Sequence, residues 1–144
     1  MLVHQILKSK ADGEVVTIRP SVTAADAAKI MSKRKIGAVV VSEDGKAALG
    51  ILSERDIVSE LGKRGTICLS DKVETIMTRE LVTTTREESA DRVLEKMTEG
   101  RFRHMPVMDG AEMVGLISIG DVVKARLFQL SNEKEALEGM IMGH

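Results

Sequence analysis

The stretch GILSERDI at residues 50–57 is followed sixty-five residues later by GLISIGDV at residues 115–122. In both stretches a glycine and two apolar residues precede Ser-x-x-Asp and a further apolar residue, where x is any residue. A short apolar run favours a buried strand, and serine is a preferred residue at the start of a helix. The motif therefore predicts, twice in this chain, a strand that leads directly into a helix.

The similarity between the two halves extends upstream of this motif. Residues 17–41 align with residues 83–107 at a shift of 66, and removing one residue from the second turn gives the shift of 65. Four positions of the first segment meet an identical residue type in the second: Thr17, Ala24, Met31 and Val41. One gap at a turn is normal between repeats, so we interpret the chain as a duplication.

Each copy predicts the order β-α-β-β-α, from β-branched runs, apolar residues at helical spacing, and a Gly-containing tight turn between two strands. The first copy is expected to hold strands at 15–18, 38–41 and 47–52, with helices at 23–33 and from Ser53 onward. The second is expected to hold strands at 81–85, 104–108 and 112–117, with helices at 88–99 and from Ser118 towards Leu137, ending near Gly139. A linker at 62–70 and a short helix at about 71–77 would join them.

One such unit buries too small a core to be stable by itself. We therefore predict an α+β fold in which two repeats, residues 1–63 and 64–130, pack around a pseudo-two-fold axis, followed by a helical tail at 131–144. Clefts form between repeats packed in this way, and clefts are where ligands bind.

Composition excludes several classes of function. A formal net charge of -1 gives no general attraction to nucleic acid or anionic lipid. With two Phe and no Trp or Tyr, the chain lacks the stacking surfaces that bind single-stranded nucleic acid. No apolar run approaches the length of a membrane span, and the N-terminus lacks the pattern of a signal peptide, so we expect a cytoplasmic protein.

The chain has few of the cysteine and histidine residues that bind metals or act as nucleophiles. Cys68 is the single cysteine and sits in an apolar stretch, which favours a buried, inert thiol. His4, His104 and His144 are too far apart to show the spacing of metal ligands. No P-loop, Rossmann glycine pattern or nucleophile elbow is present, so we expect a protein that is not an enzyme.

The Ser-x-x-Asp element has two interpretations. A helix that begins at the serine presents free backbone N–H groups and a positive dipole end, which attract phosphate, and the aspartate one turn later can accept hydrogen bonds from a sugar diol. The same pattern is also a capping box. Both roles can coexist, and recurrence at equivalent points of a repeat favours a ligand site.

The repeat resembles the CBS domain, named for cystathionine β-synthase, over about residues 1–130. The matching pieces are TIRP at 17–20, IGAVVV at 36–41, GILSERDI at 50–57, FRHMPV at 102–107 and GLISIGDV at 115–122. The resemblance implies a stand-alone tandem CBS pair, or Bateman module. Such modules bind AMP, ADP, ATP, NAD(H) or S-adenosylmethionine, with the Asp holding the ribose and the Ser contacting ribose or phosphate.

The resemblance also implies two clefts, each of which borrows residues from both copies. One would use Ser118 and Asp121, with Arg103 and His104 near the phosphate and with Thr17, Gly37 and Ala38 along the adenine. The other would use Ser53 and Asp56, with Thr83, His104, Met105 and Pro106 from the second copy. Because Arg103 and His104 align with Gly37 and Ala38, we expect a compact phosphorylated ligand such as AMP to prefer the Asp121 cleft.

We therefore expect a sensor of adenosine nucleotides (AMP, ADP/ATP or NAD(H)) that shifts the activity of an unknown partner protein. Association of CBS pairs through their helices, together with the apolar residues Leu127, Leu130 and Leu137 of the tail, predicts a homodimer. The alternative is a structural dimerisation module whose ligand sites have degenerated.

Overall fold

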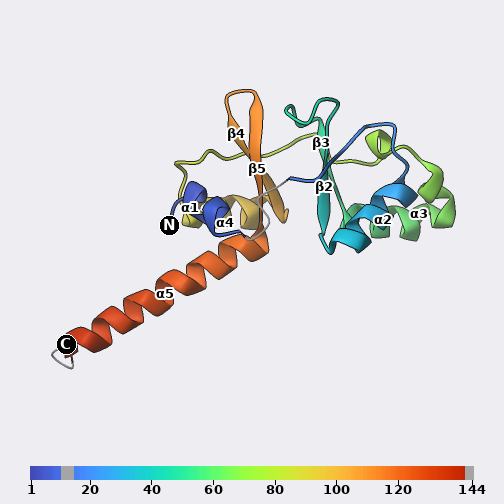
Figure 1. Cartoon of the computed structure of the whole chain (residues 1–144). Coiled ribbons are helices and arrows are strands. Elements are labelled where there is room, and N and C mark those ends of the chain that lie inside the picture. The colour runs from blue at the N-terminus through green and yellow to red at the C-terminus, as the bar shows by residue number, and fades with distance from the viewer. Residues whose placement is uncertain (11–14, 142–144) are drawn as a thin grey trace.

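The fold is described here from a computed structural model that covers residues 1–10 and 15–141. The first repeat contains a mixed three-stranded sheet. Strand β1 (Thr17–Ile18) runs parallel to β2 (Ala38–Val41), which runs antiparallel to β3 (Gly50–Ser53). Helices α2 (Ala24–Arg34) and α3 (Glu54–Arg64) accompany this sheet on one side (Figure 1).

The second repeat contains a two-stranded antiparallel sheet, formed by β4 (His104–Asp109) and β5 (Glu112–Ser118), together with α4 (Ala90–Gly100) and α5 (Ile119–Ile141). Helix α1 (Val3–Ser9), which the sequence did not predict, lies beside it, and the 3₁₀ segments η1 (Gly65–Ser70) and η2 (Val73–Thr75) connect the repeats. The two sheets stand next to each other, and α5 projects away from the body (Figure 1).

Local sequence explains where the principal helices begin. The hydroxyls of Thr23 and Ser89 accept hydrogen bonds from the backbone N–H groups of Asp26 and Arg92, at 3.2 and 3.1 Å, and so cap α2 and α4. Each cap satisfies a backbone donor that would have no partner inside its helix. The predicted α+β class is confirmed, and so is the order β-α-β-β-α in the first repeat, whereas the second repeat has the order α-β-β-α.

Several predicted boundaries are wrong. Residues 81–85 form no strand, because only Thr84 pairs with β4, through a single bridge to Val107. The strand expected at 47–52 begins at Gly50, and the short helix expected at 71–77 is the 3₁₀ turn η2. Helix α5 passes through Gly139 to Ile141, since Gly only weakens a helix and needs a turn conformation to end it.

The core has three parts. One lies within the first repeat, around Val39, Leu52 and Met31, and another within the second repeat, around Met97, Met105 and Ile117. The third joins the sheets of the two repeats and consists of Ala38, Val40, Ile51 and Met113. The chain therefore buries the strand faces of its two copies against each other, as a duplicated fold requires.

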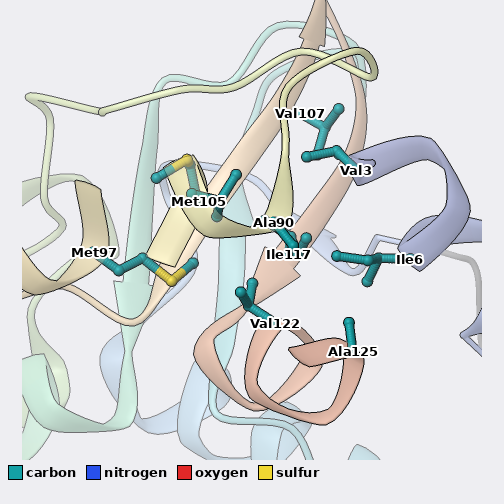
Figure 2. Close-up of a cluster of buried hydrophobic side chains, with 10 residues drawn as sticks. Val3, Ile6, Ala90, Met97, Met105, Val107, Ile117, Val122 and Ala125 are labelled. Atoms are coloured by element: carbon teal, nitrogen blue, oxygen red, sulfur yellow. The ribbon is translucent and has the colours of Figure 1, made fainter. Parts of the chain in front are cut away.

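Helix α1 packs with the second repeat although it begins the chain. Figure 2 shows Val3 and Ile6 pointing into the cluster that includes Ala90, Ile117 and Val122. Both side chains are buried, and the backbone N–H of Val3 donates to the carbonyl of Glu88 at 2.9 Å. Residues 3–9 therefore pack against the second repeat although they precede the first.

Candidate functional site

Both Ser-x-x-Asp elements are capping boxes. The backbone N–H of Ser118 donates to Asp121 Oδ2 at 2.9 Å, and the N–H of Asp121 donates to Ser118 Oγ at 3.1 Å. Ser53 and Asp56 repeat this pair of bonds at 2.9 and 3.2 Å. In both boxes the aspartate uses only Oδ2, and within the described part of the chain neither Oδ1 has a hydrogen bond or ion pair. The box therefore orients each carboxylate and leaves one oxygen available to a ligand.

Asp121 opens onto a cavity of about 700 Å³ between the repeats. The second repeat contributes His104, Ser118 and Asp121, and the first contributes Gly37 and Ala38. Four Lys and Arg side chains also line the cavity: Lys10, Arg34, Lys35 and Lys124. Its apolar wall includes Val15, Val16, Ile36 and Leu116. The cavity thus combines one carboxylate with an excess of positive charge and an aliphatic surface.

Lys10 is a site residue that sequence reasoning missed. Its Nζ lies 2.9 Å from Asp121 Oδ2 and donates to the carbonyl of Leu116 at 2.8 Å. Lys10 and Asp121 lie near opposite ends of the chain, so no local pattern could have joined them. The ion pair fixes Asp121 further through Oδ2 and leaves Oδ1 as the oxygen that a ligand would approach.

Asp56 opens onto a second cavity, of about 450 Å³. Three arginines line it, Arg55, Arg101 and Arg103, and so do three acidic residues, Glu54, Asp56 and Glu80. Its charge is therefore balanced, whereas the Asp121 cavity holds four Lys and Arg side chains against one Asp. Electrostatics favour an anionic ligand in the Asp121 cavity.

The two cavities are related by the repeat. Lys35 and Arg101 directly follow the last residues of α2 and α4 and cap them. They are equivalent positions of the two copies, and both have φ of 55° in the left-handed region. Lys35 lines the Asp121 cavity and Arg101 lines the Asp56 cavity. Each cavity thus takes its carboxylate from one repeat and a helix-ending cation from the other.

Some of the predicted site residues lie together at the cavities. Ser118, Asp121, His104, Gly37 and Ala38 line the first cavity, and Ser53, Asp56 and His104 line the second. Arg34 and Lys35 are exposed and line the first cavity, although neither was among the predicted site residues. Contact of these residues with a ligand stays a prediction.

The placement of Arg103 requires a correction. Arg103 lines the Asp56 cavity and is not among the residues around Asp121. His104, the next residue, begins β4 and lines both cavities. Arg103 lies in the bend just before β4, and its side chain belongs to the Asp56 cavity although the next residue reaches both.

Four other predicted site residues line neither cavity. Met105 is fully buried in the core of the second repeat, and Pro106 is buried beside it in β4. Thr83 is exposed, and Leu81 and Val82 occupy the cavity wall in its place. Thr17 is half-buried in β1, and the preceding Val15 and Val16 reach the cavity instead.

Burial and charge set the protonation of the site. Burial lowers the pKa of the His104 imidazole below its ordinary value, and the nearby carboxylates of Asp121 and Glu54 oppose this only in part. Burial alone would raise the pKa of the Asp121 carboxyl, but the Ser118 N–H and the Lys10 ammonium outweigh it and lower that pKa. At neutral pH the site therefore holds a neutral imidazole and a charged carboxylate.

Within residues 1–10 and 15–141, no group of three or more His, Cys, Asp or Glu side chains is arranged to hold a metal ion. His144 lies outside these residues. Of the helices described, none has the length and apolar character that a membrane span requires.

Comparison with known proteins identifies the family. The model of the CBS domain matches residues 6–63 and 73–127. The chain is 37% identical over 148 residues to the mitochondrial CBS domain-containing protein CBSX3 of Arabidopsis thaliana, covering 98% of this chain and 72% of that protein. The structure of the CBS-domain protein ATU1752 from Agrobacterium tumefaciens is 41% identical, with a TM-score of 0.83 over 88% of this chain and 99% of that one.

A further structure bears on ligands. The CBS domain pair of protein MJ0100, in complex with 5′-methylthioadenosine and S-adenosyl-L-methionine, is 29% identical with a TM-score of 0.76, over 91% of this chain and 98% of that one. Together, the duplicated fold, the two family matches and these relatives show that the chain belongs to the CBS-domain family and is a tandem CBS pair.

Proposed function

We propose that this chain is a regulatory module that binds an adenosine-containing ligand between its two CBS repeats, first of all in the Asp121 cavity. One observation carries the proposal: a carboxylate oriented by a capping box keeps one oxygen unbonded and opens onto a cation-lined cavity between the copies. The MJ0100 pair, described in complex with two adenosine compounds, supports this class of ligand.

The arrangement suits the parts of such a ligand. Asp121 Oδ1 accepts hydrogen bonds from a ribose diol, and bonds to a charged acceptor are among the stronger ones in proteins. Lys35 and Lys124 lie on the same cavity and would neutralise phosphate, while Val16 and Ile36 offer an apolar surface to the adenine. The volume of about 700 Å³ lies in the range typical of small-molecule sites.

AMP, ADP, ATP and NAD(H) all fit this description. The proposed preference for the Asp121 cavity rests on Lys35 and Lys124, which line it, in place of Arg103, which does not. The Asp56 cavity is smaller and electrically balanced, so it would bind the same anions more weakly. Binding would favour one arrangement of the repeats and so shift the activity of a partner protein.

The second candidate is a structural dimerisation module with degenerate sites. The retention of both capping boxes, each with a free carboxylate oxygen at a cavity, favours ligand binding. Binding without turnover, association as a homodimer and a cytoplasmic location all stay predictions of this proposal. The relative CBSX3 carries the label mitochondrial.

The first test measures thermal unfolding of the chain with AMP, ATP or NADH. A ligand present at 100 times its dissociation constant adds about 2.7 kcal/mol to the free energy of unfolding, so at least one compound should raise Tm by several degrees. If none does so at millimolar concentration, the sensor proposal fails and the structural module is favoured.

Calorimetry on matched variants then locates the site. Asp121→Asn keeps an oxygen for the Ser118 N–H but removes the charge, and it should weaken binding by more than about tenfold. Asp56→Asn makes the same change at the other cavity and should leave the stronger site intact. Equal losses in both variants, or none in either, would contradict the assignment to Asp121.

A further inference from the structure

The outer half of α5 has no partner in the described chain. From Ser131 to Ile141 every residue except Gly139 is exposed, and this part of the helix extends beyond the body (Figure 1). Helices draw most of their stability in water from packing an apolar face. A helix that continues past the body with large apolar residues on its surface indicates a missing packing partner.

The exposed apolar residues of α5 follow a heptad pattern. Val123, Leu127, Leu130, Lys134, Leu137 and Ile141 are spaced by four, three, four, three and four residues. The five apolar members of this seam are between 41 and 84% exposed. This spacing is the signature of a two-stranded coiled coil, and a single Lys in such a seam is a known device for fixing register.

The seam lies on the side of α5 that faces away from the Asp121 cavity. Asp121, Lys124 and Phe128 line that cavity. At 3.6 residues per turn, Val123 and Leu130 each lie about 200° around the helix from the residue two positions before them. Pairing along the seam therefore leaves the cavity accessible.

The charges of α5 are segregated along its length. Residues 122–130 carry Lys124 and Arg126 and no acidic residue, a net charge of +2. Residues 131–141 carry three Glu and one Lys, a net charge of -2. An antiparallel pair places the positive half of each helix on the negative half of the other, whereas a parallel pair stacks like charges.

We propose that α5 pairs with α5 of a second copy of this chain as an antiparallel two-stranded coiled coil. Leu127 then lies opposite Leu137 of the partner subunit, and Leu130 lies beside Lys134 of the partner subunit. The interface is built from α5 alone and does not depend on the ligand, so its failure and that of the adenosine-binding proposal are distinguishable.

Cysteine cross-linking tests both the pairing and its direction. The full chain carries Cys68→Ala to remove its native thiol, and Leu127→Cys and Leu137→Cys are made separately. In the antiparallel pair two copies of position 127 are about 15 Å apart, too far for a disulfide. We expect a covalent dimer when the two variants are mixed and oxidised, and little from either variant alone.

Glu135→Cys on the outer side of the helix is the control and should not cross-link. A covalent dimer from Leu127→Cys alone would overturn the antiparallel direction, and none from the mixture would overturn the interface. A seam substitution gives an independent check. Leu130→Glu places a charge in the seam and should weaken dimerisation by roughly tenfold or more in sedimentation analysis, whereas Glu135→Gln, on the outer side of the helix, should not.

Discussion

At the scale of single residues, His104 lies where the two cavities meet. It lines both cavities, and it lies between the carboxylates of Asp121 and Glu54, with Lys10 and Arg103 also near. Burial is the dominant influence and keeps its imidazole neutral by lowering its pKa. In the proposed complex His104 would therefore offer a neutral hydrogen-bonding group, and the fixed positive charge would come from the lysines and arginines.

The lowered pKa of His104 predicts a loss of stability on mild acidification. Below the ordinary value of 6.5 the unfolded chain takes up a proton that the folded chain resists, so the free energy of unfolding falls until pH reaches the folded pKa. Urea unfolding between pH 7.5 and 5.5 should show this decline. In His104→Asn the decline should be smaller, while His4→Asn, at a residue that lines neither cavity, should match the parent chain. Parallel pH profiles for all three proteins would exclude His104 as the source.

At the scale of the elements, α2 and α4 are each followed by a positively charged residue with a strained backbone conformation. Lys35 and Arg101 are the two described non-glycine residues with positive φ. This conformation costs a residue with a Cβ roughly 1–2 kcal/mol, and Gly adopts it freely. A long cation occupies both positions and lines a cavity in each case, which is consistent with the ligand sites proposed above.

The strain predicts opposite effects on stability and binding. Lys35→Gly and Arg101→Gly should each raise the free energy of unfolding by about 0.5–1 kcal/mol in chemical unfolding. Lys35→Gly should also weaken a phosphorylated ligand of the Asp121 cavity severalfold by calorimetry, and Arg101→Gly should leave that affinity unchanged. An equal effect of the two substitutions on affinity would show that these cations do not distinguish the cavities.

At the scale of the whole molecule, the first helix, α1, packs against the second repeat. Val3 and Ile6 complete the core of the second repeat, and Lys10, just beyond α1, is paired with Asp121. The start of the chain thus supports both the packing of the second repeat and the cavity between the repeats. A duplication that looks like two equal copies in sequence is unequal in space.

This packing predicts which elements lose stability when a core residue of α1 is substituted. Ile6→Ala should lower the free energy of unfolding by about 2–4 kcal/mol, because it leaves a cavity among buried side chains. Hydrogen exchange should then accelerate first in α4, β4 and β5, and less in the first repeat. Val58→Ala, at an exposed apolar residue, is the control and should change little. Acceleration confined to α2, β2 and β3 would contradict the placement of α1.

The sequence by itself determined the local features of this protein. The helix starts at Ser53 and Ser118 and the tight turn at Gly110 depend on residues a few positions apart, and each formed as predicted. The same local spacing produced the capping boxes that orient Asp56 and Asp121. It also supported the correct family, since the matching motifs are short and contiguous.

Tertiary structure alone decided the composition of the cavities. The ion pair of Lys10 with Asp121, the transfer of Arg103 to the Asp56 cavity and the burial of Met105 all depend on how one repeat lies against the other. A period of two assigns side chains to alternate faces of a strand, but it does not say which face meets the second copy. That choice was made by the shared core of Ala38, Val40, Ile51 and Met113, whose members come from both halves of the chain.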